Sequence, residues 1–228
     1  LRLDGKIERP RVELFFDRPN ETLGIRDLRL FLDPNGQAYA YRGNSQSRLG
    51  PFASNGNILL PKGRPTVIDI AALEVAGSTA RGQLRADPGG FTGQLRLAEV
   101  PLSGTLDFAP ANGDQRIEAH LAASNLAVAG PPALSVRSGR IDGIIILAEG
   151  RTTLDGSVTA RGLSTGGISL ARLTANARLV NGSGEVRAAL AGTRGTAFQL
   201  VTVAQVTPDR ISLTGRGELA KRPLTLDS

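Results

Sequence analysis

The sequence predicts an all-β protein built as a long antiparallel meander of short strands. Apolar residues recur at every second position along most of the chain, which is the period of a strand with one buried face. Turn-forming Gly, Pro, Asn and Asp residues separate these alternating segments. With 40% apolar and 21% charged residues among 228, the composition is that of a folded chain, and the length suits one large all-β domain.

The alternating segments can be followed along the chain, each bounded by a turn signal. Strands with one buried face are expected over residues 12–16, 28–32, 91–97, 102–108, 117–121 and 173–179. Tight turns are expected at 33–36, 87–90, 112–113 and 181–182, where Asn-Gly and Pro-Gly pairs supply residues that tolerate positive φ. The Ala-rich stretch from Ala119 keeps the strand phase with Ile117 and Leu121 and stops at Gly130-Pro131-Pro132.

A repeat of the form apolar-x-Gly-x-apolar lies inside these strands. Its copies are Leu3/Gly5/Ile7, Ala80/Gly82/Leu84, Phe91/Gly93/Leu95, Leu102/Gly104/Leu106, Ile141/Gly143/Ile145 and Leu154/Gly156/Val158. Glycine in mid-strand marks a bend, a bulge or a close approach of another group. Because each glycine is in phase with the apolar residues, side chains are thinned on the inward face. This predicts a sheet curled tightly toward its apolar side.

The chain is expected to form one domain over residues 1–228. The best candidate breaks, at 61–65 and 130–132, resemble long turns within a continuing meander. The repeat spacing of about 11 residues predicts roughly 20 strands. The chain starts at Leu1 without a signal-like segment, so it is expected to be a piece of a longer protein, and any membrane anchor would lie outside it.

Catalytic and metal chemistry find little support in the residues. The chain has no Cys and a single histidine, His120, which falls on the polar phase of its strand. Carboxylates occur singly, mostly at turns or outward positions, without the clustering that metal loops or acid/base pairs require. We therefore expect no enzyme activity, no cofactor and no metal site. Arginines are spread singly and aromatic residues make up 4%, so nucleic-acid binding is not expected either.

A one-faced sheet without helices must cover its apolar face in some other way. It can close as a sandwich or barrel, stack as a solenoid, or curl into a trough whose interior is filled by a ligand. Periodicity alone leaves these three solutions open, and it favours the first two, because a filled core is the commoner arrangement of alternating apolar residues.

A resemblance favours the trough. The run Gly-Gly-Phe-Thr-Gly-Gln-Leu-Arg-Leu over residues 89–97, the repeated Leu-x-Gly-x-Leu and Leu-Asp-Gly-x-Val units, and the segments 210–220 and 223–226 resemble the repetitive β region of the TamB family, the translocation and assembly module related to AsmA-like proteins. The resemblance covers most of the chain and lies in the pattern of degenerate repeats. It implies a long curved antiparallel meander forming a taco-like hydrophobic groove.

The resemblance also implies a function. Proteins of this family span the periplasm of Gram-negative bacteria from an inner-membrane anchor, move phospholipids between the membranes, and assist outer-membrane protein assembly and secretion with a barrel partner of the TamA type. The anchor and the partner contacts would lie outside this chain. Phospholipid acyl chains are the expected ligand. The residues expected to line the groove are Phe91, Leu95, Leu97, Leu102, Leu106, Phe108, Ile117, Leu121, Ile141, Ile145, Leu154 and Val158.

Two other hypotheses remain. In the first, the chain is a structural or adhesin-like β-solenoid with a core filled by its own side chains. In the second, the open edge of the sheet holds unfolded barrel strands by β-augmentation.

Overall fold

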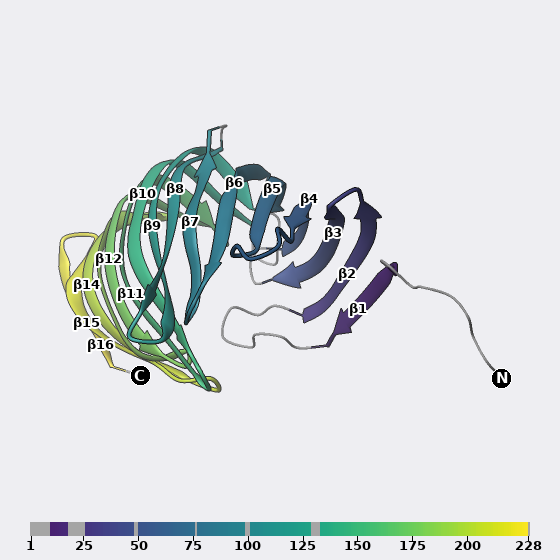
Figure 1. The fold of residues 1–228 in the computed structure, drawn as a ribbon. Coiled ribbons are helices and arrows are strands. Elements are labelled where there is room, and N and C mark those ends of the chain that lie inside the picture. Colours follow the sequence, from purple (N-terminus) through teal and green to yellow (C-terminus); the bar gives the residue numbers. More distant parts are fainter. Residues whose placement is uncertain are drawn as a thin grey trace, which may run out of the picture.

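The computed structural model describes residues 10–17, 26–47, 50–75, 77–98, 101–128 and 133–227. They form one antiparallel sheet of 16 strands in which every strand pairs with the next along the chain. This confirms the predicted all-β meander (Figure 1). The strands are β1 (Val12–Phe16), β2 (Arg26–Asn35), β3 (Ala38–Ser47), β4 (Gly50–Leu59), β5 (Val67–Val75), β6 (Ser78–Asp87), β7 (Gly90–Leu97), β8 (Leu102–Ala111), β9 (Asp114–Val128), β10 (Leu134–Ala148), β11 (Arg151–Thr165), β12 (Ile168–Val180), β13 (Ser183–Arg194), β14 (Thr196–Val206), β15 (Ile211–Leu219) and β16 (Arg222–Asp227).

The tight turns lie where the Asn-Gly pairs predict them. Asn112 and Gly113 have φ of 54° and 87°, and Asn181 and Gly182 have φ of 49° and 76°, so both turns place two successive residues at positive φ. This is the two-residue turn whose twist matches that of the flanking strands. The turn expected at 33–36 starts later, because β2 continues to Asn35 and Pro34 is paired with Tyr39.

The described residues form 16 strands, fewer than the roughly 20 expected from the repeat spacing. The first eight strands have 5 to 10 residues, which agrees with the short repeat. Strands β9, β10 and β11 each have 15 residues and β12 has 13, so the second half of the chain makes fewer and longer strands. The 11-residue spacing of Gly82, Gly93 and Gly104 therefore predicts the strand length for β6 to β8 but not for the longer strands β9 to β12.

The sheet is strongly curved and is not closed. Figure 1 shows it bending from β1 at one side of the molecule to β16 at the other. Among the described residues, β1 pairs only with β2 and β16 only with β15. Close contacts beyond neighbouring strands join β6 to β8 and β7 to β9, which places the tightest curl there.

The two candidate breaks do not interrupt the sheet. Residues 61–65 belong to a longer turn, and β4 and β5 pair on its two sides. Residues 130–132 lie outside the described residues, but β9 and β10 on either side of them pair along their length. The copy of the repeat at Leu3/Gly5/Ile7 also lies outside the described residues.

Candidate functional site

Paired residues of the sheet line up in rows that cross all the strands. Directly opposed residues of antiparallel strands point to the same face, so each row belongs to one face of the sheet. We call the face that carries most apolar side chains the apolar face. Its central row, followed through the pairings from β1 to β15, is Val12, Leu32, Tyr41, Gly56, Ile70, Gly82, Leu95, Leu106, Ala119, Gly143, Gly156, Ala177, Val186, Ala204 and Leu213.

All twelve residues expected to line a groove lie on this apolar face. Ten of them occupy the central row and the rows next to it on β7 to β11, and Phe91 and Leu102 lie one row further out in the same phase. Their surroundings differ. Leu95, Leu97 and Leu102 are buried, with 2%, 5% and 8% of their surface exposed. Phe91 and Ile141 are exposed, each at 36%. The other seven are half-buried: Leu106, Phe108, Ile117, Leu121, Ile145, Leu154 and Val158.

The buried members belong to a packed cluster on the tightly curled part of the sheet. Tyr41, Ile70, Ala80, Leu84, Leu95, Leu97, Leu102 and Ala123 form this cluster, and half-buried residues such as Leu106, Phe108 and Leu121 pack against it. The hydroxyl of Tyr41 lies 2.9 Å from Oγ of Ser54, and burial raises the pKa of Tyr41. The apolar face therefore packs against itself in this region.

The glycines of the repeat allow this curl. Gly93 has a φ of 153° and Gly104 a φ of 131°, a backbone region that L residues with side chains rarely adopt. A Cβ atom at Gly93 would collide with the carbonyl oxygen of Gln83, and one at Gly104 with the carbonyl oxygen of His120. Neighbouring backbones approach too closely for any side chain at these points. This agrees with the predicted role of the in-phase glycines.

The apolar face has another character on β9 to β12. Here the central row holds only small residues: Ala119, Gly143, Gly156 and Ala177. On one side it is flanked by a row of large aliphatic residues, Ile117, Ile145, Leu154 and Leu179. On the other side lie Leu121, Ile141, Val158 and Ala175. Rows on one face are about 6.7 Å apart. The row of small residues therefore forms a shallow strip across these strands, between two rows with larger side chains.

The opposite face is polar and carries a ladder of paired charges. His120 Nδ1 lies 2.9 Å from Oδ1 of Asp142, and His120 Nε2 lies 3.2 Å from Oε1 of Glu118. Arg116 and Arg140 pair with the same two carboxylates. The hydrogen bond to Asp142 is the main cause that raises the pKa of His120, and His120 lowers the pKa of Asp142 in return.

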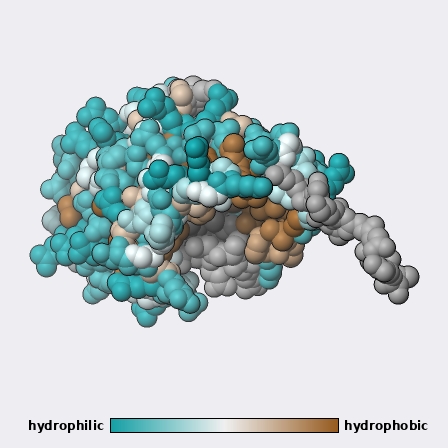
Figure 2. Space-filling view, in the orientation of Figure 1, coloured by the Kyte–Doolittle hydropathy of each residue, from teal (hydrophilic) through white to brown (hydrophobic). Residues whose placement is uncertain are grey.

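The prediction that His120 lies on the polar face is thus confirmed, since the ring is exposed and paired with surface carboxylates. Further along this face, Asp155 pairs with Arg178 at 2.8 Å and Glu185 with Arg187. Figure 2 shows the result: the surface in this view is mostly hydrophilic, and hydrophobic side chains gather beside the hollowed part.

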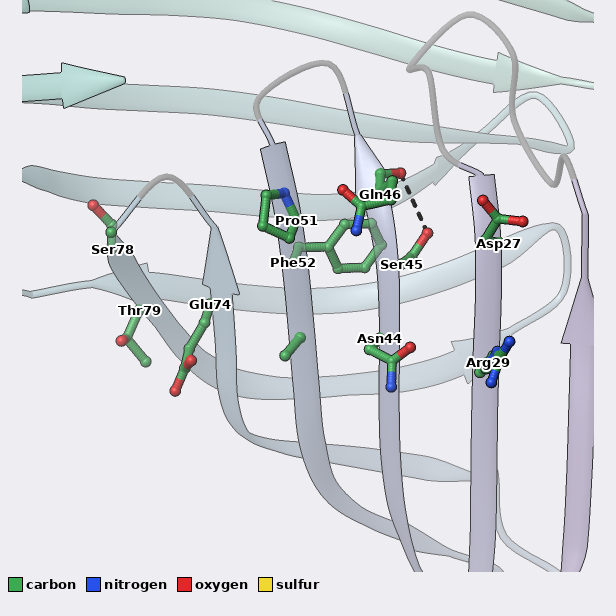
Figure 3. A pocket seen from close by; sticks show the side chains of 12 residues that line it. Asp27, Arg29, Asn44, Ser45, Gln46, Pro51, Phe52, Glu74, Ser78 and Thr79 are labelled. Atoms are coloured by element: carbon green, nitrogen blue, oxygen red, sulfur yellow. Dashed lines mark hydrogen bonds between the residues drawn. The ribbon is translucent and has the colours of Figure 1, made fainter. Parts of the chain in front are cut away.

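A cavity of about 840 Å³ lies near the ends of strands β2 to β6. It is lined by Asp27, Arg29, Asn44, Ser45, Gln46, Pro51, Phe52, Ala53, Glu74, Gly77, Ser78 and Thr79 (Figure 3). Its lining is more polar than the apolar rows, and Oγ of Ser45 donates a hydrogen bond to the carbonyl oxygen of Arg26 at 2.6 Å. The sequence gives no signal for this cavity, because its residues come from the ends of five strands.

The described part of the chain holds no group of three His, Cys, Asp or Glu residues placed to bind a metal ion. None of its elements is a helix long and apolar enough to cross a membrane.

Comparison with known proteins gives no further guide to function. No protein-family model, curated protein or solved structure matches the chain. The resemblance to the TamB family accordingly stays a hypothesis based on the repeats.

Proposed function

We propose that this chain is a segment of a hydrophobic trough that binds the acyl chains of phospholipids, in an envelope-spanning protein of the TamB type. One observation carries the proposal. The apolar rows all lie on one face of a single open sheet, and no second layer of the described residues packs over that face. An apolar sheet face exposed to water is unfavourable unless something covers it.

The free energy of hydrocarbon transfer explains why such a face suits lipid transport. Exposing an acyl chain to water costs about 0.8 kcal/mol per methylene group, or about 12 kcal/mol for a 16-carbon chain. A continuous apolar face removes most of that barrier at every position along it. The rows supply this continuity, because they cross strand after strand without a charged residue among the central-row positions from Val12 to Leu213.

Strands β9 to β12 are the part of the face best suited to hold a chain. The strip of small residues there leaves room between two rows of mostly aliphatic side chains. Most of those side chains are half-buried, Ile141 is exposed, and of the two rows Leu121 packs against the cluster. A hydrocarbon tail lying across the strands would contact both rows. It would bury apolar surface that the chain itself leaves uncovered.

The rest of the proposal follows from the resemblance. It places the protein in the periplasm of a Gram-negative bacterium, anchored to the inner membrane through a segment outside this chain. It also assigns a role in outer-membrane protein assembly and secretion, through a barrel partner of the TamA type that other parts of the protein contact. The repeated glycine-containing strands support this placement.

Photocrosslinking at two neighbouring isoleucines tests the lipid site. Ile145 lies on the apolar face and Ile144 on the polar face, where it is paired with Glu118 and Asp155. A photoreactive amino acid at position 145 is expected to capture phospholipid when the chain is made in cells, whereas one at position 144 is not. Equal capture at both positions, or capture only at 144, would contradict the proposal.

The packed cluster favours one alternative for part of the molecule, the structural solenoid with a self-filled core. Native mass spectrometry separates the two functions. A lipid carrier is expected to retain phospholipid after gentle purification, and a purely structural sheet is expected to appear at the mass of the bare chain.

A further inference from the structure

Arginines on the polar face of β9 to β13 lie in two kinds of surroundings. Near the turns that follow β8, β10 and β12 they pair with carboxylates: Arg116 lies 2.7 Å from Glu118, and Arg178 lies 2.8 Å from Asp155. At the opposite end of the same strands, three arginines are exposed and form no ion pair among the described residues: Arg137, Arg161 and Arg172. We call these three residues the arginine patch.

Two residues of the arginine patch face each other across a strand pair. Arg161 on β11 is directly opposed to Arg172 on β12. Directly opposed residues have Cβ atoms about 5 Å apart, and like charges in this position are destabilising. The next residues in the row do not offset this charge, because Arg161 lies opposite Ser138 and Arg172 lies opposite Ala191. An anion from outside these strands would remove the repulsion.

A break in the regular pairing brings Arg137 to the same place. The pairing skips one residue on each of four neighbouring strands, namely Asn125, Arg137, Gly162 and Ala171. Extra residues of this kind are β-bulges. Gly162 has a φ of 62°, and a Cβ atom there would lie 2.9 Å from Cβ and 3.3 Å from Nε of Arg137. The Arg137 side chain therefore lies over Gly162, which directly follows Arg161 in the chain.

Hydroxyl groups rather than carboxylates surround the arginine patch. The neighbouring row toward the turn between β11 and β12 holds the exposed residues Ser135, Ser164, Ser169 and Thr193. From β9 to β14 this row, the row of Arg161 and the row of Arg140 contain no Asp or Glu. Serine and threonine hydroxyls can donate hydrogen bonds to phosphate oxygens, and guanidinium groups bind phosphate in bidentate fashion. The surroundings thus suit a phosphate group.

We propose that the arginine patch docks this chain onto a bilayer surface by binding the phosphate groups of anionic phospholipids.

The spread of positive charge fits an extended anionic surface better than a single ion. Turns of an antiparallel meander alternate between the two ends of the strands, so the turns after β11, β13 and β15 lie at one end. Arg194 and Lys221 lie at these turns, on the same side as the patch. A bilayer presents many phosphates at once, and each Lys or Arg near an anionic surface strengthens binding about fivefold. The choice of a membrane over another extended polyanion rests on the proposed function.

Vesicle co-sedimentation of the whole chain tests the docking surface. The chain is expected to bind vesicles of phosphatidylcholine and phosphatidylglycerol mixed about three to one, and to bind phosphatidylcholine vesicles much less. Raising the ionic strength from about 0.01 M to about 1 M should release it, because the Debye length shortens about tenfold. Equal binding to both kinds of vesicle, or binding that resists salt, overturns the proposal.

Two glutamine variants on one strand give the matched comparison. Arg172→Gln and Arg178→Gln remove the same charge from the same face of β12. Arg172→Gln should weaken vesicle binding about fivefold. Arg178→Gln should change it less than about twofold at an ionic strength of about 0.15 M, because position 178 is three rows, about 20 Å, from position 172. Equal losses would mean that net charge alone drives binding and that the patch has no special role.

Thermal unfolding without vesicles tests the repulsion within the patch. Arg172→Gln should raise the melting temperature by about 1 to 3 °C, because it removes the like charge opposite Arg161. This result would also confirm that the variant is folded. A lower melting temperature would show that the chain itself already neutralises the pair, which contradicts the proposal.

Soluble anions separate the other possible ligands. Inorganic phosphate at the total phosphate concentration of the vesicles should leave most of the chain bound to them. Complete release would overturn the proposal in favour of a site for a single phosphate. Stronger binding to a single-stranded oligonucleotide than to the vesicles, at equal phosphate concentration, would overturn it in favour of nucleic acid.

The docking surface and the trough can fail separately. Arg172→Gln leaves the apolar face unchanged, so a photoreactive residue at position 145 should capture phospholipid in this variant as in the unchanged chain. Capture at position 145 by a chain that does not bind anionic vesicles would refute the docking surface alone. Vesicle binding without capture at position 145 would refute the trough alone.

Discussion

Strands β6 to β9 and strands β10 to β14 carry the same alternation of apolar and polar residues, yet the side chains on their apolar faces are buried to different extents. In the first region Leu84, Leu95, Leu97 and Leu102 pack into a buried cluster. In the second, large aliphatic residues of the same face, such as Leu190 and Leu200, are only half-buried. Alternation therefore decides which face is apolar, and it does not decide how far that face closes on itself.

Backbone geometry accounts for the difference. In β6, β7 and β8 the in-phase glycines have φ between 131° and 156° and lie against the backbone of an adjacent strand. In β10 and β11 the paired Gly143 and Gly156 are not at positive φ, and an added Cβ would meet a carbonyl oxygen at 3.2 Å in each case. The first set of glycines permits a sharp curl of the sheet. The second set, Gly143 and Gly156, only removes side-chain volume from the apolar face.

The largest expected effect contrasts two leucines on the apolar face. Leu95→Ala in the cluster should lower the free energy of unfolding by about 3 to 4 kcal/mol, because it leaves a cavity among packed side chains. Leu200→Ala on β14 should cost about 1 kcal/mol, since its half-exposed side chain loses less contact. Urea denaturation measures both. Equal losses would show that the face is packed alike in the two regions.

A glycine pair tests the cause of the curl. Gly93→Ala should cost about 3 kcal/mol, because alanine is strained at this φ and its Cβ collides with the carbonyl oxygen of Gln83. Gly143→Ala should change stability by less than about 1 kcal/mol, since its backbone suits alanine and the contact is only tight. Thermal unfolding of the two variants gives the comparison, and similar costs would remove the distinction between the two sets of glycines.

A charge on the open part of the face should affect the ligand more than the fold. Val158→Lys is expected to lower phospholipid retention about tenfold, because it replaces the contact of one valine side chain with a hydrated ammonium group. Thr159→Lys, the neighbouring position on the polar face, is the control and should retain lipid as the unchanged chain does. Quantitative lipid analysis of the purified variants measures the ratio. Unchanged retention in Val158→Lys would place the ligand elsewhere.

The sequence predicted the all-β meander, the Asn-Gly turns at 112–113 and 181–182 and the shared face of the twelve apolar residues, because each of these follows from local spacing. Pairing is between consecutive strands, so period-2 alternation is enough to assign the face. The number of strands in the described part of the chain was overestimated because β9 to β11 each have 15 residues, and β10 and β11 continue through the Asp-Gly pairs at 142–143 and 155–156. The difference in burial between Leu95, which is buried, and Ile145, which is half-buried, depends on curvature that accumulates over several strands.

The charged ladder on the polar face joins β9 to β10, where the two regions meet, and its pH dependence can be tested through the only histidine in the chain. Bonding to Asp142 and Glu118 raises the pKa of His120 above 6.5, so its stabilising charge is complete below pH 6.5 and is lost as the pH rises through the raised value. The pKa values of both carboxyls are lowered from 3.8 and 4.5, so their contribution is complete above these values and is lost in acid. The ladder is therefore complete between about pH 4.5 and 6.5.

Titration of the His120 ring by NMR measures this directly. Asp142→Asn should bring the pKa of His120 down toward 6.5, and Glu118→Gln should lower it less, because the bond to Asp142 is the larger cause. An unshifted histidine in the unchanged chain would mean that β9 and β10 are not held in this register at the surface. Since the ladder is exposed, even its full loss should leave the cluster around Leu95 folded. Curvature and packing on the apolar face, rather than charge on the polar face, then account for the difference between the two regions.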